Sequence, residues 1–171
     1  MKILIFSDSH GKTESMLAVA HMLAKDVSHM LHLGDNVAGY ELLQRSFPSH
    51  AVHGVAGNCD FFSNAAVETL LEINGKRILM THGHRHGVKA DIYRLHCAAR
   101  EQRADICLYG HTHIANVETA DGILLMNPGS IALPRGYEHK SYGIIDIADS
   151  GQINAAVVAL HRGTYKIIRS N

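Results

Sequence analysis

Acidic, amide and imidazole side chains follow five apolar runs of this sequence, and each group contains or adjoins a glycine. The five groups are Asp8-Ser9-His10, Gly34-Asp35-Asn36, Gly57-Asn58-Cys59-Asp60, His82-Gly83-His84 and Gly110-His111-Thr112-His113. Carboxylate oxygens, amide oxygens and imidazole nitrogens all bind divalent metals. Burying them together would be costly unless something bound them. We therefore expect the five groups to meet at one metal centre.

The spacing inside two of the groups suits paired metal ligands. Asp8 and His10 are two residues apart, and so are His111 and His113. In an extended backbone such residues point to the same side. Taken alone, each group has an ordinary structural explanation, such as a turn; the ordered set of five favours a metal. The mixed donors suit Mn²⁺, Fe, Co²⁺, Ni²⁺ or Zn²⁺, and the sequence does not choose among them.

The bulk composition excludes several classes of protein. A chain of 171 residues predicts a single domain over 1–171, and a net charge of zero argues against a strongly basic nucleic-acid surface. No apolar stretch approaches the ~20 residues of a membrane span. Three widely spaced cysteines, Cys59, Cys97 and Cys107, argue against a disulfide framework or a thiolate zinc site and favour a reducing cytoplasm. The 14 histidines support a metal hypothesis.

The order of the secondary-structure elements that would position these groups changes halfway along the chain. In the first half, apolar runs and helical spacing predict β-α-β-α-β: strands over 2–7, 28–34 and 51–57, and helices over 14–25, capped by Thr13, and 39–47. The second half is rich in strands, predicted over 66–73, 76–82, 105–110, 113–119, 123–126, 141–147 and 152–160, with one helix over about 88–102. Two packed sheets with helices outside accommodate both halves.

The ordered motifs D-x-H, G-D, G-N-x-D, H-G-H and G-H-T-H resemble those of the calcineurin-like metallophosphoesterase superfamily, from Met1 to about Asp146. The small size and the segment "NPGSIALPRG" (127–136) resemble its single-domain branch, the YfcE-like phosphodiesterases. This resemblance implies an α/β fold, a four-layer α-β-β-α sandwich with two mixed sheets. It also implies a hydrolase that cleaves phosphoric monoester or diester bonds.

The resemblance further implies two divalent cations, with Mn²⁺ expected first. Its motifs assign Asp8, His10 and His113 to one ion, Asn58, His82 and His111 to the other, and Asp35 to both as a bridge. Ions paired in this way lie ~3.5–4 Å apart and lower the pKa of a shared water, and the resulting hydroxide attacks phosphorus in line. The residues expected in catalysis are therefore Asp35, Asn58, Asp60 and His82.

Four residues are candidates for contacts with substrate. Asn127 and Arg135 could bind phosphate oxygens; the alternative is a tight turn at Pro128-Gly129 and a solvated Arg135. His84 could contact the substrate or lie behind the metal ligands. Cys59 stands where much of the superfamily has a histidine thought to protonate the leaving group. A thiol is the weaker acid, so the alternative role for Cys59 is to fill space beside the site.

The expected partner is a phosphate-ester substrate, with no membrane and no nucleic acid, and self-association into a homo-oligomer is left open. A catalytically weak scaffold that binds partner proteins is the alternative, because the superfamily contains sorting-complex subunits of that kind. A nuclease is a further alternative, against which the neutral charge counts.

Overall fold

The computed structural model of this protein describes residues 1–161 and 164–171. The first sheet consists of the strands β1 (Lys2–Phe6), β2 (His29–His32), β3 (Ala51–Gly54), β9 (Ser141–Ile147), β10 (Ile153–His161) and β11 (Thr164–Ser170). The helices α1 (Glu14–Leu23) and α2 (Val37–Ser46) pack against it. The second sheet consists of the strands β4 (Glu68–Ile73), β5 (Lys76–Thr81), β6 (Ile106–Leu108), β7 (Ala115–Ala120) and β8 (Ile123–Pro128). The 3₁₀ turn η1 (His84–His86) and the helix α3 (Tyr93–Glu101) lie between β5 and β6 in sequence.

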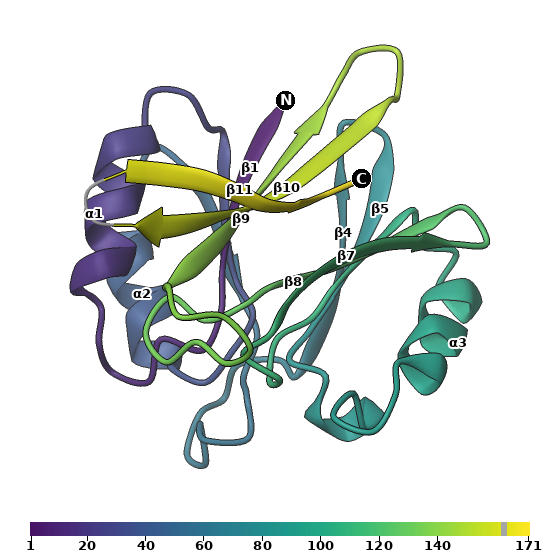
Figure 1. The fold of residues 1–171 in the computed structure, drawn as a ribbon, viewed down its shortest axis with the longest axis horizontal. Helices are drawn as coiled ribbons and strands as arrows, with labels where there is room; N and C mark the ends of the chain where they lie inside the picture. The colour runs from purple at the N-terminus through teal and green to yellow at the C-terminus, as the bar shows by residue number, and fades with distance from the viewer. Residues whose placement is uncertain (162–163) are drawn as a thin grey trace.

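The two sheets pack face to face, and helices cover their outer faces (Figure 1). The strand order is β11-β10-β9-β1-β2-β3 in the first sheet and β4-β5-β6-β8-β7 in the second. Each sheet combines parallel pairs, such as β1 with β2 and β5 with β6, with antiparallel pairs, such as β1 with β9 and β4 with β5. The expected four-layer α-β-β-α sandwich with two mixed sheets is therefore confirmed.

Apolar side chains fill all three spaces between the four layers. Ile3 and Ile5 of β1 face the space between the sheets, where they belong to one cluster with Ile78 and Met80 of β5. The alternate residues of β1 pack against α1 and α2, and a third cluster joins α3 to the second sheet. The run over 2–7 is continuously apolar because both faces of its strand are covered.

Three features of the helices differ from the sequence-based expectation. The helix α2 begins at Val37, before the expected residue 39, because the Asn36 side chain accepts a hydrogen bond from the Gly39 N–H at 3.1 Å. The helix α3 begins at Tyr93, because η1 and further turns occupy the preceding residues. Thr13 precedes α1 but makes no capping hydrogen bond through its side chain.

Among the strands, β3 ends at Gly54 rather than at residue 57, and β11 is an addition, since no strand was expected after residue 160. It pairs with β10 in an antiparallel ladder whose register shifts between Val157 and Val158. Such an irregularity breaks the alternation of buried and exposed side chains by which a strand is recognised in a sequence.

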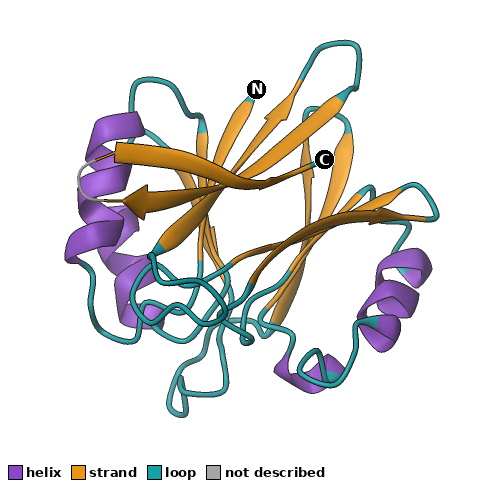
Figure 2. Ribbon diagram, viewed as in Figure 1, coloured by secondary structure: helices purple, strands orange, loops and turns teal. Residues whose placement is uncertain are grey.

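The loops that carry the polar groups gather at one end of the sandwich (Figure 2). The strands β1, β2 and β3 run parallel in one sheet, and β5, β6 and β8 run parallel in the other. Because ligands bind at the carboxyl ends of parallel strands, this end of the molecule is where a site is expected. Among the described residues, no helix has the length and apolar character needed to cross a bilayer.

Candidate metal centre

The carboxylate of Asp8 is fully buried and only half satisfied. Its Oδ2 accepts hydrogen bonds from the Ser7 hydroxyl at 2.6 Å and from the His111 backbone N–H at 3.1 Å. Among the described residues its Oδ1 has no hydrogen-bond partner, and it lies 3.2 Å from His113 Nε2 and 3.9 Å from His82 Nε2. A buried carboxylate oxygen without a donor, facing ring nitrogens, is the environment that a bound cation would complete.

The carboxylate of Asp35 divides its oxygens in the same way. Oδ1 accepts a hydrogen bond from the Cys59 backbone N–H at 2.8 Å, whereas Oδ2 lies 3.4 Å from His82 Nε2 and 3.7 Å from His10 Nε2. Burial alone would raise the pKa of Asp35, but the hydrogen bonds and charge from His82 and Cys59 lower it below its usual range. Asp35 therefore presents an ionised oxygen to histidines on two sides.

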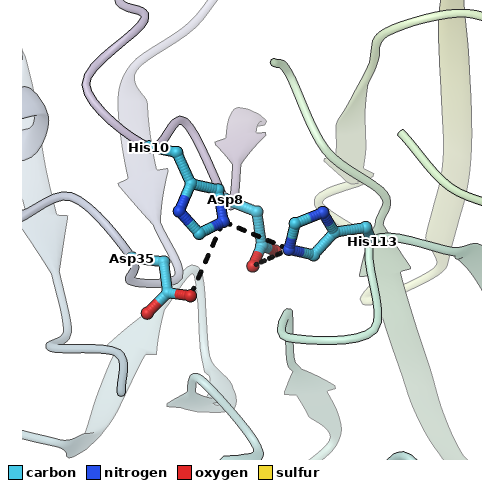
Figure 3. Close-up of side chains that lie close together, drawn as sticks. All are labelled: Asp8, His10, Asp35 and His113. Carbon is cyan, nitrogen blue, oxygen red and sulfur yellow. Dashed lines mark hydrogen bonds and ion pairs between the residues drawn. The ribbon is translucent and has the colours of Figure 1, made fainter. Parts of the chain in front are cut away.

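Backbone carbonyls orient two of the histidines. The Nδ1–H of His82 donates to the Leu33 carbonyl at 2.7 Å, and the Nδ1–H of His113 donates to the Leu133 carbonyl at 2.6 Å. These bonds turn the Nε2 atoms of His82 and His113 toward the carboxylates, which is the usual orientation of histidine ligands. Figure 3 shows His113 converging with Asp8, His10 and Asp35, and His10 Nε2 lies 3.2 Å from His113 Nε2.

Two groups of donors share Asp35. In the described part of the chain, the potential ligand atoms of Asp8, His10, Asp35 and His113 lie within 4.8 Å of one another, and so do those of Asp35, His82 and His111. Asn58 adds an amide oxygen to the second group, since its Oδ1 lies 3.2 Å from His82 Nε2. The donor set fits divalent metal, because it combines oxygen and imidazole donors around an unpartnered buried carboxylate oxygen.

The backbone at this centre is held in an unusual conformation. At the centre, five residues with acidic or imidazole side chains have φ between 45° and 66°: Asp8, His10, Asp35, His111 and His113. The left-handed region costs a residue with a side chain roughly 1–2 kcal/mol, and such residues concentrate at functional sites. Hydrogen bonds hold the strained segments, since the N–H groups of Asp8 and His10 donate to the carbonyls of Gly34 and Asp35.

Comparison with known proteins identifies the family. The model of the calcineurin-like phosphoesterase superfamily domain matches residues 1–150.

This chain belongs to the calcineurin-like phosphoesterase superfamily.

Three known proteins illustrate what this chain is similar to. A probable metallophosphoesterase, YsnB, of Bacillus subtilis is 40% identical over 147 residues, which cover 86% of this chain and 85% of YsnB. The phosphodiesterase YfcE of Escherichia coli K12 is 29% identical over 168 residues, covering 85% of this chain and 88% of YfcE. The structure of Vps29 from Entamoeba histolytica, complexed with zinc, has a TM-score of 0.81 at 23% identity, covering 100% of this chain and 98% of Vps29. The last similarity concerns the fold alone.

Two glycines of this superfamily member permit the close approach of its loops. A Cβ atom at Gly57 would collide with the Asp35 carboxylate, and one at Gly110 would collide with the Ser7 hydroxyl. The carboxylate of Asp60 holds the same loop as Gly57: Oδ2 accepts from the Gly57 N–H and Oδ1 from the Val37 N–H, both at 2.8 Å. Asp60 therefore contacts loop backbone rather than the centre itself.

Asn127 is turned away from solvent and holds the loop that carries His111 and His113. It is fully buried, its Nδ2 donates to the Gly110 carbonyl at 2.8 Å and to Thr112 Oγ1 at 3.0 Å, and its Oδ1 accepts from the Gly129 N–H. Arg135 is exposed, and its backbone N–H donates to the His113 carbonyl at 3.0 Å. Arg135 is free to meet a substrate in a way that Asn127 is not.

His84 and Cys59 lie beside the second group of donors. The His84 ring centroid is 5.5 Å from that of His82 and 6.1 Å from that of His111. His84 Nδ1 is buried and has no hydrogen-bond partner in the part of the chain that the structure describes. Burial and the neighbouring His82 lower the pKa of His84. Cys59 is exposed, and desolvation and the neighbouring Asp35 carboxylate raise the pKa of its thiol to about 11.

The sequence analysis missed two residues that hydrogen-bond to the loops that carry the candidate ligands. His32 is fully buried, its Nδ1 accepts from the Gly34 N–H at 3.2 Å, and its Nε2–H donates to Ser9 Oγ at 3.0 Å. Ser130 donates to the Asp8 carbonyl at 2.7 Å. Histidine within the apolar run over 28–34 was the signal for His32; Ser130 gave none, because its partner is 122 residues distant in sequence.

Proposed function

We propose that this protein is a metal-dependent phosphodiesterase or phosphomonoesterase that acts as one domain over residues 1–171 and holds two divalent cations, with Mn²⁺ expected first. The observation that carries the proposal is the shared Asp35, whose Oδ2 faces both groups of donors. In this proposal Asp8, His10 and His113 hold one ion, Asn58, His82 and His111 hold the other, and Asp35 bridges them. When bound, the two cations would supply Lewis-acid chemistry, activating water and neutralising phosphoryl oxygens.

The residues of the chain would prepare this chemistry in three ways. The carbonyls of Leu33 and Leu133 keep the Nε2 atoms of His82 and His113 turned toward the carboxylates that would hold the cations. Asp60 and the Cys59 N–H fix the loop that brings in Asn58. His84, whose ring lies beside those of His82 and His111, is the candidate for a contact with an ester oxygen of the substrate, and Arg135 is the candidate for a further phosphate contact.

A reconstituted assay tests this proposal. Metal-free protein is supplied with Mn²⁺, Co²⁺, Ni²⁺ or Zn²⁺ and given bis(4-nitrophenyl) phosphate and 4-nitrophenyl phosphate. We expect metal-dependent release of nitrophenol, and near-complete loss in His82→Ala. His86→Ala is the matched control, because His86 lies on the same segment but its ring pairs with Glu68 at 2.8 Å. If neither ester is hydrolysed in a metal-dependent way, the proposed enzymatic activity is refuted.

A partner-binding scaffold is the second candidate, favoured by two exposed aromatic side chains next to the centre. Phe61 is 81% exposed and Phe62 is 102% exposed, and the pair follows Asp60 in the loop that carries Asn58. Exposed large apolar groups often mark interaction sites. The same assay separates the two candidates, because a scaffold would bind metal without turning over either ester faster than His82→Ala does. The three unpaired cysteines support a cytoplasmic location for either function.

A further inference from the structure

Two adjoining cavities lie beside the loop that carries His111 and His113. Their volumes are about 260 Å³ and about 590 Å³, and Ile114, Ala115, Arg135 and Arg169 line both of them. Thr112, which separates the two histidines, lines the larger cavity, and Ile114 follows His113 directly. The two cavities therefore form one groove that begins at the candidate metal centre, and it is large enough for a small organic ligand.

The groove lies where the edges of the two sheets meet. Strand β7 is the edge of the second sheet and β11 is the edge of the first, and the two strands contact each other. From β7 come Ala115 and Asn116, and from β11 come Lys166 to Arg169. The wall of the groove thus depends on β11, the strand that the sequence analysis did not expect.

Positive charge lines the groove along its length. Lys89 lies in the larger cavity, Lys166 in the smaller one, and Arg135 and Arg169 in both. All four side chains are exposed, and none has a carboxylate within 4.0 Å among the described residues. One carboxylate contacts the lining, since Glu118 accepts a hydrogen bond from Asn116 at 2.7 Å. The described residues that line the groove nevertheless include four cationic side chains and no acidic one.

The remaining lining is apolar or aromatic. Ile114 is 49% exposed and Tyr137 is 39% exposed, so both offer accessible surface beside the cations. Arginine suits phosphate because its planar fork can form two parallel hydrogen bonds, and lysine adds a point charge. Apolar surface between such cations suits the organic part of a phosphate ester.

We propose that this groove is a substrate subsite that binds a second phosphate, carried on the organic part of a phosphodiester beyond its scissile bond. The inference rests on the proposed function, because the scissile phosphate would lie at the metal centre. It adds the substrate class: a diester whose organic part bears another phosphate, rather than a simple aryl or alkyl diester.

A matched pair of substrates tests the subsite. One is the 4-nitrophenyl ester of thymidine 5′-phosphate, and the other is the same ester with an added 3′-phosphate. Because the leaving group is identical, their ratio of kcat/KM reports the added phosphate. We expect the 3′-phosphate to raise kcat/KM on the order of tenfold through KM, as one charge-assisted hydrogen bond would. The gain should shrink near 1 M salt, where the screening length is only ~3 Å.

The double variant Lys89→Gln/Arg169→Gln should bring the ratio close to one. Arg94→Gln is the matched control, an exposed arginine on α3 that should leave the ratio as in the wild type. A wild-type ratio near one, or a ratio unchanged in the double variant, would overturn the subsite while leaving the enzyme intact.

If neither thymidine ester is hydrolysed with any metal, the proposed function fails, and a binding measurement then tests whether the groove is a phosphate site. Thymidine 3′,5′-bisphosphate is then titrated into the protein by calorimetry. Saturable binding that weakens severalfold in the double variant, but not in Arg94→Gln, would support the groove as a phosphate site. Absence of saturable binding would overturn it.

Discussion

Asp35 is the residue on which the two groups of donors depend. Its Oδ2 faces His82 on one side and His10 on the other. We expect Asp35→Ala to reduce turnover on the order of 10² more than His10→Ala does, because loss of a bridging carboxylate leaves two cations unscreened at close range. Turnover and metal content at saturating Mn²⁺ would be measured together. Near-normal turnover of Asp35→Ala would remove the bridge from the mechanism.

Cys59 occupies the position at which the resemblance to the superfamily implies a histidine. Its raised pKa keeps the thiol protonated at neutral pH, and a thiol is a weak hydrogen-bond donor. General acid catalysis is typically worth ~10²–10⁴ in rate, so a catalytic Cys59 would be easy to detect. We expect Cys59→Ala to retain most activity toward nitrophenyl diesters, whose leaving group needs little protonation. A hundredfold loss with metal still bound would make the cysteine catalytic.

His32 makes stability depend on pH. Burial lowers the pKa of His32 to about 4, and a protonated Nδ1 could not accept the Gly34 N–H. Because the folded pKa lies below the unfolded value of ~6.5, stability is full above pH ~6.5 and falls as the pH drops toward ~4. At pH 5 the loss from His32 is on the order of 2 kcal/mol.

Urea unfolding at pH 7 and pH 5, in metal-free buffer, measures this effect. Other histidines also titrate in this range, so the wild type is compared with His32→Gln. We expect the variant to be less stable at pH 7 but to lose less on acidification. Equal pH slopes in the two proteins would contradict the assignment.

At the scale of elements, the position of the loop between β3 and β4 depends on one glycine. A Cβ at Gly57 would meet the carboxylate and backbone nitrogen of Asp35, so the loop could not pack there unchanged. We expect Gly57→Ala to weaken Mn²⁺ binding at least ~10-fold, the effect of disturbing a contact behind metal ligands. Gly11→Ala is the control, because a Cβ there meets nothing within 4 Å, although its φ of +76° adds strain. Calorimetric titration with unchanged affinity in Gly57→Ala would show that the loop is adaptable.

The elements also show which parts of the fold a sequence can predict. The strand β1 was predictable because both of its faces are covered and its apolar run is unbroken. The strand β11 was not, because its ladder is irregular and Lys166 and Arg169 interrupt the apolar pattern. The start of α2 was missed because it depends on a hydrogen bond to the Asn36 side chain, and an asparagine in this position is equally typical of a polar loop.

At the scale of the whole molecule, the convergence of the five groups was predictable and their individual roles were not. Each group follows a strand, so its location at one end of the sandwich follows from topology. Whether a polar residue faces the centre or supports it depends on contacts far apart in sequence. Asn127 illustrates this, because its partners Gly110 and Thr112 lie 17 and 15 residues away and leave it no amide group for substrate.

Metal content is the prediction that concerns the whole chain. We expect Mn²⁺ titration of metal-free protein to saturate at about two ions per chain, since Asp35 joins two groups of donors. His82→Ala and His10→Ala should each lose one ion preferentially. Anomalous scattering at the manganese edge would locate them. Saturation at a single ion would remove the two-metal centre.

The donors come from both halves of the sandwich: Asp8 and Asp35 follow strands of the first sheet, whereas His82 and His111 follow strands of the second. Bound metal would therefore act as a reversible cross-link between the sheets at the end where five residues hold strained backbone. Binding that favours the folded chain adds about 2.7 kcal/mol when free metal is 100 times the Kd. The fraction of chains open to proteolysis would then rise as free metal falls, which ties the cellular lifetime of the protein to metal supply.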